Sequence, residues 1–350
     1  MAAETRCMMS SATVASRRLA WRTSGAALAM LAFTASAFAQ TQSNAASPAS
    51  AAYPSRPIRL LVPMAAGAGT DIGARILSTK LAEAILQQVV VDNRAGASGI
   101  VGAELAARAA PDGHTLMIVT ISHSVSPSLH KKLPYDIVKD FSPVSLLIEY
   151  PFLLNVHPSL PVKSVKELIA LAKAKPGQYN YASNGVGGGA YLCAELLKSM
   201  AGIKLTHVPY KSTAAAITGT VGGETGVAFY SASATLAHVK AGRFRALAMT
   251  GKKRSPSFPD LPTVAEAANL PGYEVSGWTG LVAPAGTPKP IITRLHGELA
   301  RILQIADVKE KLAVIDFEPV GNTPEEFGAF IKQQMAKWAK VLKEAGAKAE

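Results

Sequence analysis

The chain has 350 residues, of which 49% are hydrophobic and 17% are charged, and its formal net charge is +12. The length favours two domains over one, and the hydrophobic content excludes a globally disordered protein. A positive charge suits nucleic acid, an anionic membrane or anionic small molecules. The basic residues are scattered, however, with Lys252-Lys253-Arg254 as the longest run, and aromatic residues make up only 6%. We therefore do not expect nucleic-acid binding.

Residues 1–39 have the pattern of a secretory signal peptide. Arg17, Arg18 and Arg22 stand shortly before an apolar run at residues 25–33, which is too short to span a bilayer, and Ala37-Phe38-Ala39 fits a small-x-small cleavage site. The general secretory route is preferred to a twin-arginine signal or a mitochondrial transit peptide. Removing the four arginines and one glutamate of this segment leaves +9 of the +12. Residues 40–52 are predicted to be a flexible lead-in, and the mature protein is expected in the periplasm.

The stretch at residues 58–71 predicts a strand, a turn and a helix. Residues 58–62 are short, branched and apolar, as in a buried strand, and apolar residues recur at helical spacing after Asp71. The linker between them consists mostly of small residues. A helix that starts there leaves backbone N–H groups unpaired, and these attract an anion. Thr70 or Asp71 could instead cap these groups, and the stretch would then be an ordinary turn.

Strand and helix patterns alternate through the rest of the chain. The strands are predicted at residues 89–91, 115–120, 144–156 with an interruption at 149–151, 179–181, 205–208, 227–230, 246–250 and 273–282. The helices are predicted at residues 97–110, 190–200, 214–218 and 290–303, and after the caps at Ser164, Thr263 and Thr323. This alternation favours an α/β protein with two lobes, each a mostly parallel sheet flanked by helices. We place domain 1 at residues 53–154 plus 277–350 and domain 2 at residues 155–276.

A glycine-rich turn at Gly185–Ala190 allows two interpretations. It fits G-x-G-x-x-A between a strand and a helix, which is a dinucleotide fingerprint. The expected acidic residue about twenty positions further on is missing, and Lys211 would at most favour a phosphorylated ribose. The same glycines can instead hold a carboxylate with backbone N–H groups alone. Together with the turn before Asp71, they could grip both ends of a dicarboxylate across an interdomain cleft, although two unrelated turns also fit.

Catalytic and metal-binding patterns are missing from the sequence. There is no G-x-S-x-G, H-E-x-x-H or C-x-x-C motif, and no carboxylate pair stands out as an acid and a base. His123 directly follows a predicted strand and could reach the cleft. Cys7 is removed with the signal peptide, and Cys193 lies among leucines in a predicted helix, where a buried structural role is expected. We predict no catalytic residue, no metal and no cofactor.

An ordered set of motifs runs along nearly the whole mature chain. These motifs are Tyr53-Pro54-x-x-Pro57-Ile58, Val62-Pro63 with Gly67 and Asp71, Asp92-Asn93-Arg94-x-Gly96-Ala97, Leu133-Pro134-Tyr135-Asp136, Asp140-Phe141-Ser142-Pro143-Val144, Val208-Pro209-Tyr210-Lys211, Ala241-Gly242-Arg243, Arg245-Ala246-Leu247-Ala248, Pro262-Thr263-x-x-Glu266, and Trp278 with Ala283-Pro284-Ala285-Gly286-Thr287-Pro288. Together these motifs resemble the Bug-type periplasmic receptors of tripartite tricarboxylate transporters, and so many matches in order are more specific than any single motif.

The resemblance implies a monomeric two-domain binding protein that closes on a small organic carboxylate and passes it to a membrane permease. In the family, the loops that match Met64–Asp71 and Ser183–Gly188 hold the ligand, with a contribution from the Tyr210 loop. The candidate ligand-binding residues are Ala65, Ala66, Gly67, Asp71, His123, Ser183, Asn184, Gly185, Gly188, Tyr210 and Tyr230. A secreted sensor of the same fold without a transport role, and an NADP-dependent enzyme, are the alternatives.

The sequence departs from the family pattern at the ligand loops. The first loop has alanines where prolines and paired glycines are usual, and the second has Gly188 and Tyr191 where Ser and His are often found. Tyr230 stands where many members carry an Asp after the strand that ends at Phe229. Losing a carboxylate removes a partner for a ligand ammonium group. The resemblance therefore predicts a ligand without an amino group, or a more aromatic acid.

Overall fold

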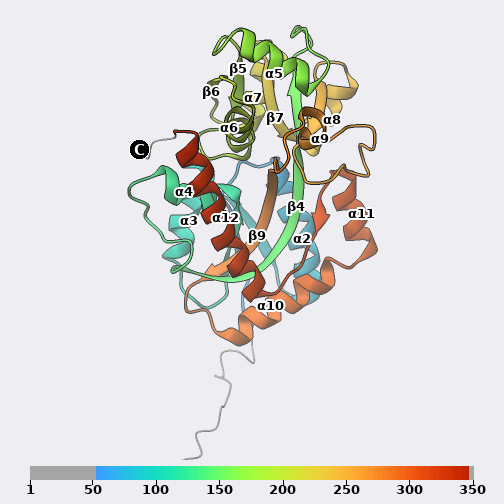
Figure 1. Cartoon of the computed structure of the whole chain (residues 1–350). Coiled ribbons are helices and arrows are strands. Elements are labelled where there is room, and N and C mark those ends of the chain that lie inside the picture. The colour runs from blue at the N-terminus through green and yellow to red at the C-terminus, as the bar shows by residue number, and fades with distance from the viewer. Residues whose placement is uncertain (1–52, 347–350) are drawn as a thin grey trace, which may run out of the picture. The chain divides into compact units, whose positions relative to one another are not determined.

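The computed structural model describes residues 53–346, and Figure 1 shows the arrangement of their helices and strands. Residues 47–350 belong to one compact unit. The predicted signal peptide (residues 1–39) and lead-in (residues 40–52) lie outside the described residues. The account of the fold below therefore concerns residues 53–346 alone.

Strands and helices alternate along the described chain, as the sequence predicts. The strands are β1 (Ile58–Val62), β2 (Val89–Asn93), β3 (Thr115–Thr120), β4 (Phe141–Val156), β5 (Asn180–Ser183), β6 (Thr206–Pro209), β7 (Val227–Ser231), β8 (Arg245–Met249), β9 (Ser276–Pro284) and β10 (Glu318–Pro319). The helices are α2 (Gly69–Ile85), the 3-10 helix η1 (Ala97–Gly99), α3 (Ile100–Ala107), α4 (Ile121–Leu129), α5 (Val165–Ala174), α6 (Gly189–Ala201), α7 (Thr213–Val221), α8 (Ala232–Lys240), α9 (Val264–Ala268), α10 (Lys289–Ile302), α11 (Ala306–Val314) and α12 (Pro324–Glu344).

The strands follow the order β2-β1-β3-β9-β4-β7-β5-β6, with β10 and β8 also paired to β4. We call β1, β2, β3, β9, β10 and the first part of β4, with their helices, the first lobe. The second part of β4 with β5 to β8 forms the second lobe. The predicted parallel pairs are present in both lobes: β1 pairs with β2 and β3, and β5 pairs with β6 and β7. The two-lobed α/β prediction is confirmed, with antiparallel pairs added by β4 and β9.

Strand β4 is continuous, so the predicted interruption at residues 149–151 is wrong. Its first part pairs with β9 up to Pro151, and from Phe152 onward it pairs with β7 instead. Pro151 lies where one partner replaces the other, a position at which a missing N–H is tolerated. The partner change falls close to the predicted domain boundary at residues 154 and 155. The division into two domains itself remains a prediction, because residues 47–350 form one unit.

Several predicted local features are present. Ser164, Thr263 and Thr323 cap α5, α9 and α12 through side-chain oxygens that accept backbone N–H groups. Cys193 is fully buried in α6, as expected of a structural cysteine. Helix α12 packs against α4 of the first lobe and α6 of the second, and Figure 1 shows it beside both. This helix therefore adds packing contacts between the lobes to the two chain crossings, which lie in β4 and between β8 and β9.

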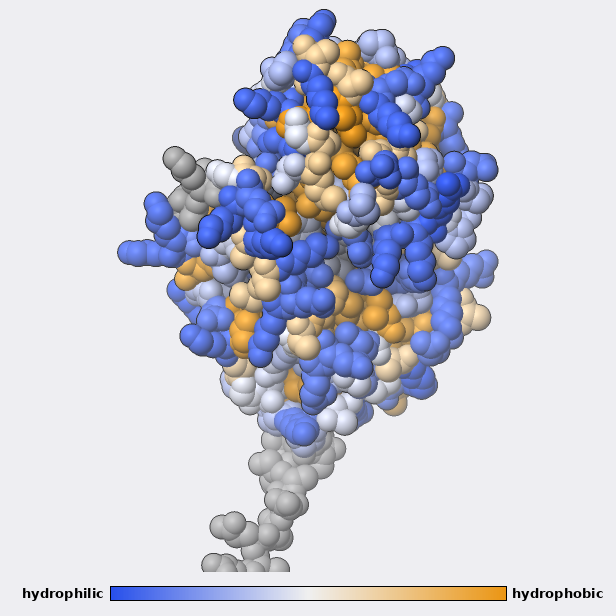
Figure 2. Space-filling model, viewed as in Figure 1, coloured by the Kyte–Doolittle hydropathy of each residue, from blue (hydrophilic) through white to orange (hydrophobic). Residues whose placement is uncertain are grey.

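One face of the described region is mainly polar (Figure 2). Figure 2 shows one face that is largely hydrophilic, with smaller hydrophobic areas between the charged side chains. Among residues 53–346, no helix combines the length and apolarity needed to cross a bilayer. Within the same range, no group of three or more His, Cys, Asp or Glu side chains could hold a metal ion.

Candidate ligand-binding site

The first lobe presents an uncapped helix start. Strand β1 ends at Val62, and α2 begins at Gly69 after the N-cap residue Ala68, which has no side chain able to cap. The N–H groups of the first helical turn have no partner within a helix. Those of Gly69 and Thr70 are therefore available to an anion, and the helix dipole favours a negative charge there. The predicted candidates Ala65, Ala66 and Gly67 lie exposed in the turn just before this helix.

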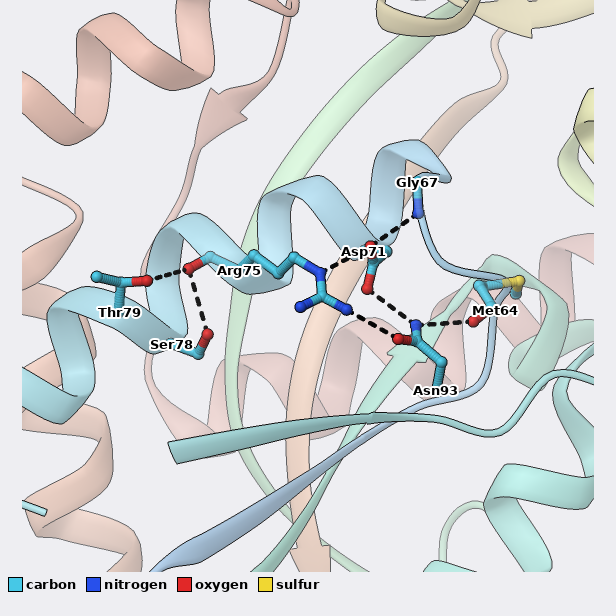
Figure 3. A network of polar contacts seen from close by, with 7 residues as sticks. All are labelled: Met64, Gly67, Asp71, Arg75, Ser78, Thr79 and Asn93. Atoms are coloured by element: carbon cyan, nitrogen blue, oxygen red, sulfur yellow. Dashed lines mark hydrogen bonds and ion pairs between the residues drawn. The ribbon is translucent and has the colours of Figure 1, made fainter. Parts of the chain in front are cut away.

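Asp71 organises this turn (Figure 3). Its carboxylate is 2% exposed and accepts hydrogen bonds from the Gly67 backbone N–H at 2.9 Å, from Arg75 Nε at 2.9 Å and from Asn93 Nδ2 at 2.8 Å. The same Asn93 amide donates to the Met64 carbonyl at 3.0 Å. Arg75 Nη2 completes the network by donating to Asn93 Oδ1 at 2.9 Å. The turn between Met64 and Gly67 is therefore tied down at both ends.

The charge state of Asp71 follows from these contacts. Burial raises the pKa of its carboxyl, but the hydrogen bonds from Arg75, Gly67 and Asn93 outweigh burial, and the pKa is lowered. The group is therefore ionised at neutral pH. Asp71 bonds to the residue before the N-cap rather than capping the first turn of α2, so the simple capping interpretation does not describe it. Direct contact between Asp71 and a ligand remains a prediction.

The second lobe presents a similar helix start. Strand β5 ends at Ser183, and α6 begins at Gly189 after the N-cap Gly188, again without a side-chain cap. The N–H groups of Gly189 and Ala190 belong to the first helical turn, so they have no partner within the helix. A Cβ added to Gly188 would lie 2.5 Å from Asn184 Oδ1. Glycine at 188 therefore keeps the Asn184 amide in its place beside the helix start.

Ser183 holds the loop before α6, residues 184–188, which we call the second loop. Its side chain is fully buried, and its Oγ lies 3.1 Å from both the N and the O of Gly185. The backbone N–H of Tyr210 donates to the Ser183 carbonyl at 2.8 Å, which joins the predicted Tyr210 loop to the same point. Gly185 has a φ of +116°, a backbone conformation that side chains disfavour. Ser183 therefore holds the conformation of the second loop through its contacts with the backbone of Gly185.

A row of three aromatic rings connects the two helix starts. The Tyr150 ring stacks on Phe317 at 4.5 Å between centroids and meets the edge of Phe152 at 5.6 Å. A Cβ on Gly69 would lie 3.1 Å from Phe317 Cζ, and a Cβ on Gly189 would lie 2.2 Å from Phe152 Cζ. Tyr150 and Phe152 occupy alternate positions of β4, the strand that both lobes share. The row therefore forms an apolar link from one helix start to the other.

Three serines that the sequence reasoning missed also lie at these helix starts. Ser98 Oγ donates to the Val186 carbonyl at 3.0 Å, a hydrogen bond from the first lobe to the second loop. On the other side, a Cβ on Gly69 would lie 3.2 Å from Ser233 Oγ and 3.4 Å from Ser231 Oγ. Ser231 could have been found from the sequence by its position, because it ends a strand that leads into a helix. Ser183 also ends a strand that leads into a helix.

Three of the predicted ligand-binding side chains have partners or burial within the protein itself. The Tyr210 hydroxyl donates to Glu224 at 2.9 Å. Tyr230 is 2% exposed in a core cluster with Phe244, and His123 is fully buried beside the backbone N–H of Thr120. Burial lowers the pKa of His123 to about 4, so the ring is neutral at ordinary pH. Ligand contact by these three side chains remains a prediction.

A cavity of about 580 Å³ lies elsewhere in the second lobe. Its lining includes Phe244, Phe258 and Leu261, with Arg245 and Asp260 among its polar residues. Arg245 already donates to the carbonyls of Leu160 and Val162. The cavity contains none of the predicted ligand-binding residues.

Two α/β lobes that share β4, each with an anion-attracting helix start, define the class of two-lobed solute-binding receptors. The chain belongs to the receptor family of the tripartite tricarboxylate transporters, whose family model matches residues 73–347. This is a family of receptors and not of enzymes, and it confirms the resemblance carried by the sequence motifs.

Individual relatives cover nearly the whole chain. BugT from Bordetella pertussis is 38% identical over 306 residues, spanning 87% of this chain and 94% of BugT. A protein from the tcbD-tcbE intergenic region of Pseudomonas sp. strain P51 is 37% identical over 308 residues, spanning 88% and 92% of the two chains.

Solved structures are similar as well. Rpa4515 from R. palustris with adipate has a TM-score of 0.80 and 36% identity, over 84% of this chain and 98% of that one. MatC from Rhodopseudomonas palustris with bound malate has a TM-score of 0.76 and 32% identity, over 83% of this chain and 100% of MatC. The periplasmic binding protein BugD has a TM-score of 0.79 and 34% identity, over 85% of this chain and 100% of BugD.

Proposed function

We propose that this protein is a periplasmic receptor that captures a small organic carboxylate between its lobes and delivers it to the membrane permease of a tripartite tricarboxylate-type transporter. The observation that carries the proposal is the pair of uncapped helix starts, at Gly69 and Gly189, one in each lobe. Each offers backbone N–H groups and the positive end of a helix dipole to an anion. No reactive side chain is needed for such binding.

Two similar proteins support the ligand class. Rpa4515 has been solved with adipate and MatC with malate, and both molecules carry a carboxylate at each end. A helix start on either side of an aromatic row suits a ligand of the same kind. Tyr230 stands where the family often has an Asp, so this position supplies no carboxylate to pair with a ligand ammonium group. We therefore propose a dicarboxylate whose middle part is a methylene chain or an aromatic ring.

The periplasmic location and the permease partner rest on different support. The location rests on the signal-peptide pattern of residues 1–39. The permease rests on membership of the transporter receptor family. In this proposal, ligand binding stabilises the closed arrangement of the lobes, and the permease recognises that arrangement.

A carboxylate screen tests the proposal. Purified residues 40–350 would be heated with aspartate, glutamate, citrate, malate, adipate and an aromatic dicarboxylate, and each hit would be measured by isothermal titration. We expect dicarboxylates without an amino group to raise the melting temperature, because a ligand that binds only the folded state stabilises it. Tight binding of aspartate or glutamate would contradict the proposed ligand class. A chemically altered ligand after incubation would contradict the receptor function itself.

A further inference from the structure

A histidine of the second lobe, His207, lies directly behind the second loop. It belongs to β6, and its Nε2 lies 2.6 Å from the Oγ of Ser183, the last residue of β5. The same Oγ lies 3.1 Å from the backbone N and 3.1 Å from the backbone O of Gly185. His207 therefore reaches the second loop through a single serine hydroxyl.

The contacts of this hydroxyl specify where His207 carries its proton. A hydroxyl donates one hydrogen bond and accepts two. The Gly185 N–H and a His207 Nε2–H fill the two acceptor places, and the hydroxyl proton then points to the Gly185 carbonyl. With the proton on Nδ1 instead, the hydroxyl must donate to Nε2, and the carbonyl loses its partner. All three contacts are thus satisfied only with Nε2–H, in a neutral or a protonated ring.

Two tyrosines and an ion pair surround the ring. Tyr181 stacks on it at 5.0 Å, and Tyr191 meets it edge-on at 5.1 Å. From α6, Lys198 Nζ and Glu195 Oε1 form an ion pair at 2.7 Å, and the Tyr181 hydroxyl donates to the same carboxylate. Burial lowers the pKa of His207, Glu195 raises it and Lys198 lowers it, and the net shift is downward from 6.5. The ring is therefore neutral at neutral pH and takes up a proton only in more acidic solution.

We propose that His207 is a positioning residue of the ligand site. Through Ser183 it holds the second loop in its binding shape, and in its protonated form it strengthens the binding of a carboxylate. Proton uptake needs no rearrangement, because Nε2–H is already the donor to Ser183. It adds a positive charge behind the loop, whose helix start faces the anion. The second half of this inference rests on the proposed function, whereas the first half concerns the loop alone.

The sign of the pH effect follows directly. A bound anion favours the charged form of His207, so binding and protonation strengthen each other. Affinity therefore rises as the pH falls through the pKa of His207. For a solvent-screened pair we expect about a threefold gain once the pH lies below the pKa of His207, measured relative to a variant that cannot titrate. Protonation of the ligand itself affects both proteins equally and is removed by that comparison.

The role of His207 in holding the second loop is tested without ligand, by hydrogen–deuterium exchange of residues 184–190. His207→Leu removes the donor to Ser183, and we expect exchange there to become about fivefold faster, as for the loss of one hydrogen bond. His207→Gln offers an N–H near the Nε2 position, so it should restore most of the protection. His157→Gln is the matched control, because His157 Nδ1 also lies 2.7 Å from a serine hydroxyl, that of Ser159, but near the opposite end of β5 and β7. Wild-type exchange in His207→Leu would overturn the loop-holding role.

The effect of the His207 charge on affinity is tested with malate and adipate as probes in isothermal titration, in steps from pH 7.5 down to about pH 4 so that the series passes through a pKa lowered from 6.5. The wild-type protein and His157→Gln should show the acidic gain, and His207→Gln should not. Equal pH slopes for wild-type and His207→Gln would overturn the charge effect. If the wild-type protein binds neither probe, nor any other carboxylate of the screen, the proposed function fails. In that case the exchange experiment still decides whether His207 holds the second loop.

Discussion

The two helix starts of the candidate site are shaped by different chemistry. The turn before α2 is held by a buried carboxylate, an arginine and an asparagine, all centred on Asp71. The loop before α6 is held by the hydroxyl of Ser183 and by glycines with little room around them. Both present unpaired backbone N–H groups. The comparison teaches that a helix start without a side-chain cap can be held in shape either by charged side chains or by a hydroxyl and glycine backbone conformations.

The largest expected effect is at the second helix start, which has less room for an added side chain than the first. A Cβ at Gly189 would lie 2.2 Å from the buried Phe152 ring, so Gly189→Ala must displace that ring. Overpacking of this kind costs about 1–3 kcal/mol of unfolding free energy, and we also expect ligand affinity to fall at least tenfold. Urea unfolding and isothermal titration measure the two quantities. The control is Gly297→Ala, at an exposed position of α10 with nothing near the added Cβ, where stability should rise slightly.

At the first helix start, the sharpest change is Asp71→Ala. It leaves the Gly67 N–H and the Asn93 amide without their acceptor, which costs about 1–3 kcal/mol of stability. Because the turn from Met64 to Gly67 is then no longer held, we also expect the ligand affinity of the folded protein to fall. This fall should be larger than the loss of folded protein alone would produce. Asp112→Ala is the matched control, since Asp112 also accepts a backbone N–H and pairs with an arginine, Arg56, away from both helix starts. Equal affinities for the two variants would contradict the positioning role of Asp71.

The pH dependence of the unfolding free energy should distinguish the first helix start, which is held by the charged Asp71 carboxylate, from the second. The folded-state pKa of Asp71 is lowered from 3.8, so its ionisation stabilises the fold fully above that value. This contribution is lost as the pH falls from 3.8 through the lowered folded-state pKa. The difference in unfolding free energy between wild-type and Asp71→Asn should therefore shrink below pH 4 and be constant between pH 5 and pH 8. A difference that kept its size at pH 2 would show that the charge of Asp71 is not what holds the turn.

The smallest expected effect is at the contact between the lobes. Ser98 donates one hydrogen bond to the Val186 carbonyl at 3.0 Å in a solvent-exposed place. Ser98→Ala removes a bond worth about 0.5–1.5 kcal/mol, and we expect a two- to tenfold faster release of ligand with little change in association. Stopped-flow kinetics would measure both rates. Ser159→Ala, at the far end of the second lobe, is the control and should leave both rates unchanged.

The elements that were predictable from sequence are those with local signals. Both strand–turn–helix stretches of the candidate site were found because small residues and glycines stand between a strand pattern and a helix pattern. The caps at Thr263 and Thr323 were found because each motif fits within four residues. The strand at residues 89–91 was also found, but it continues to Asn93, and this extension carries the Asn93 amide to Asp71.

What could not be predicted depends on distant segments meeting. Phe317 stacks on Tyr150 from far along the chain, and Ser98 reaches Val186 across 88 positions. Neither pair has a periodic pattern or a motif. Pro151 was interpreted as a strand breaker, because no local signal shows that β4 changes partner at that residue. His123 was proposed because it follows a strand and Tyr230 because of the family resemblance, and only tertiary packing shows that both side chains are buried.

The central claim is that main-chain N–H groups at the two helix starts hold the ligand. A crystal structure of the protein with a dicarboxylate identified by the screen tests it most directly. We expect one carboxylate within hydrogen-bond distance of the Gly69 or Thr70 N–H, and the other close to the N–H of Gly189 or Ala190. A ligand bound away from both helix starts, for example in the cavity lined by Phe244 and Phe258, would contradict the account.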